Sequence, residues 1–224
     1  IDPRFMTVDS WRAVFLAIPL ILVMAMGQMM VIICRHVDIS IGSTLAFAAI
    51  VIGLVFIHYP GISLWLALII TSLVGLILGL INGFIVTRFN VHSIIVTLGT
   101  LSLYRGLVFI VSGGRQIDRN EIPEHIVLFS QTSFLFSIPA ILIFSAVIVI
   151  ISHILMRHSV LGREIYATGS NPVAAHLKGI NVTKVTLFCF GVCGMLAGIA
   201  GLFYASRFGY VNPGVTGVGI EFIV

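Results

Sequence analysis

Charged residues are scarce in this chain of 224 residues. Lysine, arginine, aspartate and glutamate together make up 9% of it, whereas hydrophobic residues make up 59%. Soluble globular domains carry about 25% charged residues, which they need to cover a surface that faces water. The composition therefore excludes an ordinary soluble domain and predicts that lipid surrounds much of the chain.

Motifs of several binding classes are also missing. No G-x-x-x-x-G-K-[ST] phosphate loop occurs, so the chain is not itself a P-loop ATPase. The basic residues stand singly or in pairs between apolar runs, which excludes a nucleic-acid interface built on a basic stripe. The three cysteines, Cys34, Cys189 and Cys193, lie in or beside apolar runs without a C-x-x-C pair or further ligands nearby. We interpret them as packing residues, and no metal site and no cofactor of the chain's own is predicted.

A catalytic constellation is missing as well. An intramembrane hydrolase would need an activated serine and a histidine on facing helices. The sequence contains no G-x-S-x-G elbow, and His153, the best placed histidine, has no evident serine partner. The sequence therefore predicts no catalytic residue and no enzyme activity.

What the chain does contain is a series of long apolar runs. A helix that crosses the hydrocarbon core of a bilayer needs about 20 predominantly apolar residues. Six runs reach that length, and they predict an all-α bundle with at least six membrane spans. The predicted spans are Val14–Cys34, Ile41–Tyr59, Ser63–Val86, Ser93–Val111, Phe136–Leu155 and Thr183–Ala205. Glycines at every fourth position, at 75, 79 and 83 and again at 194 and 198, predict helix faces that pack closely.

The distribution of lysine and arginine predicts the orientation. Residues 157–184 contain four of these basic residues and one acid, whereas residues 113–136 balance two arginines against three carboxylates. Because cytoplasmic loops are enriched in basic residues, residues 157–184 are predicted to be cytoplasmic and residues 113–136 to face the other side. Alternation of the spans then places Arg88 and His92 on the cytoplasmic side.

Polar residues interrupt the apolar pattern between the first two spans, at residues 35–43. Asp38, Ser40 and Ser43 lie here with no room for an ordinary surface loop. Irregular backbone at membrane depth is tolerated only where it is buried in protein or lines a cavity. These residues can cap the next helix or border a translocation path, and the two roles are compatible. Arg35, His36 or backbone N–H groups are expected to satisfy the Asp38 carboxylate.

Two further places break the pattern. Tyr104 and Arg105 lie inside the fourth predicted span, where an arginine either pairs inside the bundle, snorkels to an interface or contacts a solute. Residues 206–219 are rich in glycine, with Asn212 and Pro213, and predict an irregular segment after the sixth span. Tyr104, Arg105 and Asn212 join Asp38, Ser40 and Ser43 as candidates for lining a translocation path.

The hydrophilic stretch at residues 157–184 predicts a short helix. Ser170 or Asn171 can cap its start, Pro172 suits the first helical position, and Gly179 suits its end. A few residues would be enough to connect two spans. A capped helix of about two turns is therefore interpreted as a docking surface for a cytosolic partner.

At these places the sequence resembles a known family, the permease subunits of bacterial ABC importers for ribose, xylose, rhamnose and related sugars and for autoinducer-2. The resemblance is carried by V-D-I-S-I-G-S at residues 37–43, A-T-G-S-N-P at residues 167–172 and G-V-G-I-E at residues 217–221. It covers nearly the whole chain from about Trp11. Members of this family usually have a further span at the front and more spans behind, so residues 1–224 are expected to form a single permease domain that is part of a longer one.

The resemblance implies a location and a division of labour. It implies a multi-pass protein of the bacterial inner membrane that passes a monosaccharide or autoinducer-2 through a channel. The implied partners are a periplasmic sugar-binding protein, a second permease subunit in a homodimer or heterodimer, and a cytosolic subunit that binds and hydrolyses ATP. The docking surface for that subunit would consist of Gly169, Asn171, Pro172, Ala175, His176 and Lys178.

An ion-coupled secondary transporter of a small polar solute is the alternative. Such a protein would use carboxylates within the membrane to carry the coupling ion. Asp38 and Glu221 are the candidates for that role, and both lie in motifs of the importer family.

Overall fold

Long helices account for most of the fold. The computed structural model describes residues 8–131, 133–134 and 138–224. The long helices are α1 (Val8–Ile33), α2 (Ile41–His58), α3 (Leu64–Phe89), α4 (Ser93–Ser112), α6 (Ala140–His158) and α9 (Val182–Phe208). Shorter elements connect them, namely η2 (Arg119–Glu121), α5 (Glu124–Gln131), β1 (Ser133–Phe134), β2 (Ile138–Pro139), α7 (Val160–Ser170), α8 (Pro172–Leu177) and η4 (Ile220–Phe222).

All six predicted membrane spans are confirmed as helices. Each long helix is apolar enough to cross a bilayer, and the boundaries differ from the predictions by a few residues. The predicted start of the fifth span at Phe136 lies outside the described residues, and α6 begins at Ala140. The only sheet in the described part of the chain pairs the two-residue strands β1 and β2, so the fold class is all-α.

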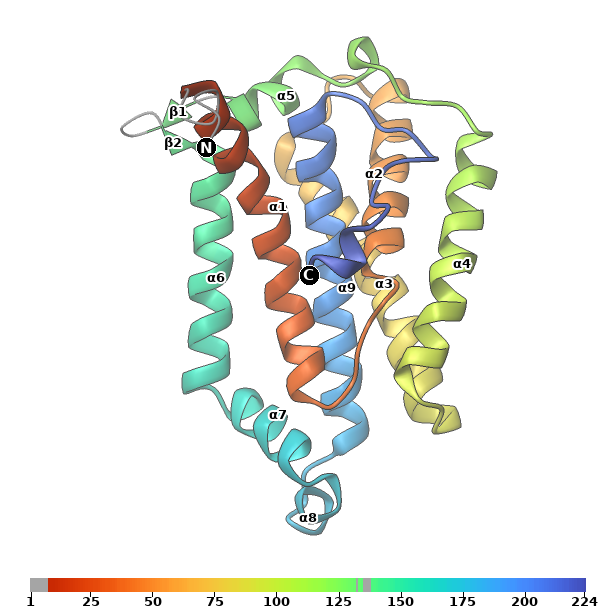
Figure 1. The fold of residues 1–224 in the computed structure, drawn as a ribbon, viewed down its shortest axis with the longest axis vertical. Helices are drawn as coiled ribbons and strands as arrows, with labels where there is room; N and C mark the ends of the chain where they lie inside the picture. Colours follow the sequence, from red (N-terminus) through yellow and green to blue (C-terminus); the bar gives the residue numbers. More distant parts are fainter. Residues whose placement is uncertain (1–7, 132, 135–137) are drawn as a thin grey trace, which may run out of the picture.

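Helix α9 is the centre of the bundle. It lies among α1, α2 and α3, while α4 and α6 flank the group on opposite sides (Figure 1). In its most apolar window 78% of α9 is buried, compared with 28% for α4 and 22% for α6. The outer helices therefore present most of their apolar side chains to lipid or to another subunit.

The predicted glycine faces bring α3 and α9 into backbone contact. A Cβ atom at Gly75 or Gly79 would overlap backbone atoms of α9, and one at Gly194 or Gly198 would overlap backbone atoms of α3. Lipid provides no hydrophobic force that holds two spans together, so close approach of backbones and the resulting dispersion contacts take its place. This interface fixes the position of α9 against α3.

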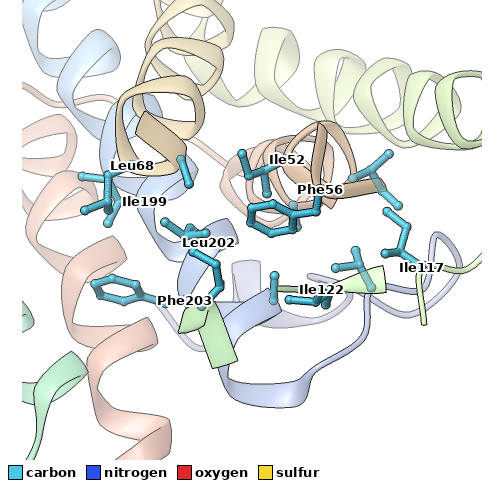
Figure 2. Close-up of a cluster of buried hydrophobic side chains, with 14 of the residues drawn as sticks. Ile52, Phe56, Leu68, Ile117, Ile122, Ile199, Leu202 and Phe203 are labelled. Carbon is cyan, nitrogen blue, oxygen red and sulfur yellow. The ribbon is translucent and has the colours of Figure 1, made fainter. Parts of the chain in front are cut away.

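Aliphatic and aromatic side chains fill one end of the bundle. Figure 2 shows Ile52 and Phe56 of α2 and Phe203 of α9 in a cluster of apolar side chains. Residues 113–123, called the crossing segment below, follow α4 and contribute Ile117 and Ile122 to this cluster. The backbone of Ile117 also pairs with Val211 through two hydrogen bonds of 2.9 and 3.0 Å. The crossing segment is thereby tied to the chain that follows α9.

The two predicted irregular segments are observed, with adjusted ends. Residues 34–40 are not helical, but α2 already begins at Ile41, and α9 continues to Phe208 before the chain becomes irregular. Figure 1 shows that α2 starts part of the way along the bundle and that the chain after α9 folds back beside it. Both irregular segments therefore pack against the helices of the bundle with part of their length, since Asp38 and Thr216 are buried, while Arg35, Val215 and Val218 are exposed.

The connection between α6 and α9 holds two helices where the sequence predicted one. The predicted short helix is α8, and its cap is confirmed, since Asn171 Oδ1 accepts hydrogen bonds from the N–H groups of Val173 and Ala174 at 3.1 Å. Helix α7 precedes it and was not predicted, because its mixture of glycine, serine and charged residues resembles a loop. Residues 157–184 and 113–131 lie at opposite ends of the bundle, and the turn between α3 and α4 lies at the same end as α8, as the orientation argument requires (Figure 1).

Candidate functional site

A cluster of polar side chains is buried where α2, α3 and α4 meet the segment 34–40. It contains Asp38, Ser40, Asn82 and Tyr104, none of which is more than 2% exposed. One Asp38 carboxylate oxygen accepts hydrogen bonds from the Ser40 N–H at 2.9 Å and the Ser40 hydroxyl at 2.6 Å. The cluster is therefore built around a carboxylate with local donors.

Asn82 connects that carboxylate to α4. Its side-chain amide donates to Ser40 Oγ at 2.8 Å and lies 3.4 Å from both Asp38 oxygens. Its carbonyl oxygen accepts a hydrogen bond of 3.1 Å from the Tyr104 hydroxyl, which also lies 3.0 Å from the Leu78 carbonyl. The chain of contacts joins the irregular segment to α3 and α4, and each of these side chains has a partner.

The structure corrects one expectation about this cluster, the capping role of Ser40, and shows which of the expected partners Asp38 has. Ser40 stands at the cap position of α2, but its side chain makes no capping hydrogen bond and binds Asp38 instead. The Ser43 hydroxyl donates to the Ser40 carbonyl at 2.7 Å and is fully buried. Arg35 does not pair with Asp38, because its guanidinium donates to the Ser170 carbonyl at 2.6 Å. The backbone N–H of Ser40 donates to the Asp38 carboxylate, and backbone N–H groups were among the expected partners.

Arg105 lies on a different side of α4 from Tyr104. Its guanidinium donates to the carbonyl of Thr216 and interacts electrostatically with Glu221. Thr216 belongs to the irregular residues 209–219 after α9, called the returning segment below. The other terminal nitrogen of Arg105 and Oε2 of Glu221 are buried without a hydrogen-bond partner among the described residues. Arg105 therefore does not snorkel, and part of its hydrogen-bonding capacity is unused inside the bundle.

Asn212 has a local role in the same returning segment. Its Oδ1 accepts a hydrogen bond from the Gly214 N–H at 2.8 Å, and its amide donates to Gln116 Oε1 at 2.7 Å. These contacts shape the turn after α9. The structure therefore brings Asp38, Ser40, Ser43 and Tyr104 together, and it places Arg105 and Asn212 apart from them.

A cavity of about 460 Å³ with a mixed polar and apolar lining lies between this cluster and the end of the bundle that carries α8. It is lined by side chains from the segment 34–36, the α3–α4 turn and α7, including Arg35, His36, His92 and Thr168. The Thr168 hydroxyl, 1% exposed, has no hydrogen-bond partner among the described residues. The cavity can hold water or a polar solute at that end of the bundle.

The predicted docking helix presents a mixed surface. Asn171, His176 and Lys178 are exposed, whereas Ala175 is 3% exposed and anchors the helix from beneath. Val173 and Leu177, 71% and 81% exposed, are apolar and were missed by the sequence argument. Exposed apolar side chains together on a short ordered helix are typical of a protein interface.

Helix α7, which leads into the docking helix α8, contacts the end of α1 and the irregular segment 34–40. A Cβ atom at Gly169 would overlap the carbonyl of Ile33, so α7 touches the end of α1 through its backbone. The Arg35 side chain crosses to Ser170, the last residue of α7, and Arg35 itself has a positive φ of 64°. A displacement of α7 and α8 would therefore act on the segment that carries Asp38.

Asn82 is the residue that the sequence argument missed in the buried cluster. The signal was available, because Asn82 is a lone amide inside an otherwise apolar span. Polar side chains within spans are costly and face the interior of a bundle. The glycines around it drew the interpretation toward helix packing alone.

Comparisons with known proteins agree with the fold. Residues 12–224 match the family described as branched-chain amino acid transport system, permease component. The chain is 33% identical over 221 residues to the autoinducer 2 import system permease protein LsrC of Yersinia enterocolitica, covering 99% of this chain and 60% of that protein. It is equally similar to LsrC of Salmonella paratyphi B, with 62% of that protein covered, and 31% identical to LsrC of Yersinia pseudotuberculosis, with 61% covered. The chain thus spans about 60% of the length of these relatives. No solved structure matches it.

Proposed function

The chain belongs to the family of transport-system permease components, as a multi-pass protein of the bacterial inner membrane, and we propose that it forms the transmembrane path of an ATP-driven importer. The observation that carries the proposal is the similarity along 99% of the chain to permeases that are named for autoinducer 2 import. The fold supplies what a permease needs, since helices enclose irregular polar segments at membrane depth.

The proposed solute is small and rich in hydroxyl groups, in the class of autoinducer-2, pentoses and deoxyhexoses. The relatives' names support autoinducer-2 first, while the family description names branched-chain amino acids. A polar solute requires hydrogen-bonding groups that are free to exchange partners during passage. Arg105 and Glu221 offer such atoms, whereas Asp38, Ser40 and Asn82 are occupied with one another.

The proposed partners follow the same division of labour. A periplasmic binding protein would deliver the solute, a second permease subunit would complete the path, and a cytosolic ATPase would dock on α8. Nucleotide binding and hydrolysis are assigned to that ATPase, and residues 157–184 to the cytoplasmic side. An ion-coupled secondary transporter is the less favoured interpretation, because the relatives are named as parts of import systems.

Measuring the source of energy tests the proposal. Cells that express the intact transporter are given autoinducer-2, ribose, rhamnose or leucine, and uptake is followed after ATP depletion or after addition of a protonophore. We expect ATP depletion to abolish uptake of at least one hydroxyl-rich solute and the protonophore to leave it. The reverse pattern would support the secondary transporter, and uptake of leucine alone would overturn the solute class.

The coupling role of α8 is tested at its exposed apolar residues. Leu177→Glu should reduce solute-stimulated ATP hydrolysis by at least about tenfold, because a buried apolar anchor at an interface contributes about 2 kcal/mol or more. Leu128→Glu on α5 at the opposite end is the matched control and should retain coupling. Arg35→Gln, which replaces the charged donor to Ser170, should show a smaller loss of about threefold, since a charge-assisted hydrogen bond is replaced by a weaker one.

Normal coupling in Leu177→Glu, with normal insertion in the membrane, would place the ATPase contact elsewhere. An equal loss in Leu128→Glu would show that the defect is in folding and not in docking.

A further inference from the structure

A groove of about 500 Å³ runs between α1, α6 and α7, away from the polar cluster. Its lining consists of Met26, Met29, Val149, His153, Met156, Arg157, Arg163 and Tyr166. Helix α6 is the least buried of the spans, so this side of the bundle faces outward. The volume lies within the range of about 300–1,000 Å³ that is usual for small-molecule sites.

The lining divides into two chemical zones. The part beside α1 and the body of α6 is aliphatic and rich in methionine, with Met26, Met29, Val149 and Met156. Methionine side chains are flexible and adapt to irregular apolar shapes. Where α6 ends and α7 begins, the lining changes to Arg157, Arg163 and Tyr166, while His153 lies in the body of α6 between Val149 and Met156.

The charges in this groove are of one sign, and no described residue neutralises them. No carboxylate is among the described lining residues, and Arg157 and Arg163 form no hydrogen bond or ion pair within the described part of the chain. Both arginines are exposed at the end of the bundle that carries α8. Two guanidinium groups at one end of an apolar groove complement a ligand with an anionic head and an apolar tail.

We propose that this groove is a binding site for one anionic diacyl phospholipid, such as phosphatidylglycerol, of the cytoplasmic leaflet. Arg157 and Arg163 bind the phosphate, Tyr166 lies at the level of the headgroup, and an acyl chain occupies the methionine-rich zone. Basic pockets between spans on the cytoplasmic side are suited to anionic headgroups, and aromatic side chains such as tyrosine favour the membrane interface. The site lies outside the proposed solute path, so it stands independently of which solute is carried.

The test is lipid titration of the intact, delipidated permease, read by native mass spectrometry. The probes are phosphatidylglycerol, phosphatidylethanolamine with the same acyl chains, and glycerol phosphate, which lacks them. Phosphatidylglycerol should bind more tightly than phosphatidylethanolamine, and glycerol phosphate should not compete with it. Each basic residue near an anionic lipid surface contributes a factor of about five, so Arg157→Gln/Arg163→Gln should weaken phosphatidylglycerol binding roughly 25-fold.

Arg88→Gln is the matched control, because Arg88 is an exposed basic residue at the same end that does not line the groove. It should leave the affinity unchanged. Val149→Trp fills the apolar zone and keeps both arginines, and it should also weaken phosphatidylglycerol binding; it replaces the double variant if that protein fails to insert.

Several outcomes overturn the proposal. Equal binding of the two phospholipids excludes headgroup recognition, and equal loss in Arg88→Gln reduces the effect to general electrostatics. Competition by glycerol phosphate indicates a site for a free phosphate. If the double variant changes the oligomeric state measured by light scattering and leaves phosphatidylglycerol binding intact, a second copy of the chain covers the groove instead.

Discussion

The chain leaves helical structure at two places inside the bundle, residues 34–40 and residues 209–219, and the two segments treat their polar groups differently. In the first, Asp38 and Ser40 bind each other and are held by Asn82. Beside the second, the carbonyl of Thr216 accepts from Arg105 of α4, while a further Arg105 nitrogen and Oε2 of Glu221, in η4, remain without partners in the described structure.

This difference indicates that the first segment has a structural role and that the second lies beside a candidate contact site for the solute. A fully satisfied polar cluster is rigid, and exchanging its partners for a solute would cost as much as it gained. Buried donors and acceptors without partners carry an uncompensated desolvation cost that a passing hydroxyl group can relieve. The second segment also packs against the start of α2, directly after the first segment, because a Cβ atom at Gly42 would overlap Gly217 and the Glu221 carboxylate.

The largest expected effect comes from the contact between the second segment and the start of α2. Gly217 has a φ of 74°, and a Cβ atom there would overlap the Gly42 carbonyl. Gly217→Ala combines an unfavourable backbone conformation with this overlap and should destabilise the fold by about 3 kcal/mol or more. Thermal unfolding and the yield of inserted protein measure the change.

Gly219 provides the matched control. Its φ of 80° is similar, but no atom lies within 4 Å of the position that an added Cβ would take, so Gly219→Ala should cost only about 1 kcal/mol. Equal destabilisation by the two substitutions would show that the backbone conformation alone matters and that the fold does not depend on the contact of Gly217 with Gly42.

The second effect concerns Asp38. Asp38→Leu leaves the Ser40 N–H, the Ser40 hydroxyl and the Asn82 amide with fewer acceptors and should cost about 3 kcal/mol, with loss of folded protein and uptake together. Asp38→Asn keeps one acceptor oxygen and should cost about 1 kcal/mol and retain most uptake. The measurements are folded yield and initial uptake rate in the same cells.

An Asp38→Asn protein that folds normally but transports no better than Asp38→Leu would contradict this assignment. It would show that the carboxylate itself takes part in transport, as a secondary transporter requires.

The sequence was sufficient to predict the spans because their apolar runs reach membrane length and are separated by polar residues. The α3–α9 interface was also foreseeable from glycines at every fourth position. Helix α7 was not, since its mixture of glycine, serine and charged residues resembles a loop, and its contacts through Gly169 to the end of α1 and through Ser170 to Arg35 join distant parts of the chain. Neither interaction has a local signature in the sequence.

Most residues of the candidate site could be predicted from the sequence, but their hydrogen-bond partners could not. Asp38, Tyr104 and Arg105 stand out as polar groups in apolar surroundings. Tyr104 and Arg105 are neighbours in sequence, yet successive residues of a helix point in different directions, and they enter separate environments. Only the packing of α3 against α4 shows that Tyr104 joins Asn82, and only the returning segment shows what Arg105 faces.

The smallest effect on stability, and the most direct on transport, is expected from Arg105→Lys. Lysine keeps the positive charge that faces Glu221 but has a single ammonium in place of the planar fork, so it cannot reproduce both the contact to Thr216 and the free nitrogen. We expect stability to fall by no more than about 1 kcal/mol, because one hydrogen bond is weakened and no charge is left uncompensated. If the free nitrogen contacts the solute, the apparent KM for uptake should rise about tenfold with little change in the maximal rate, since a contact made throughout passage contributes to binding alone.

Arg115→Lys, at an arginine paired with Glu121 in the crossing segment, is the control and should leave both parameters unchanged. A folded Arg105→Lys protein with an unchanged KM would remove the distinction between the two segments, because the unpartnered atoms beside Thr216 would then be as structural as the cluster around Asp38.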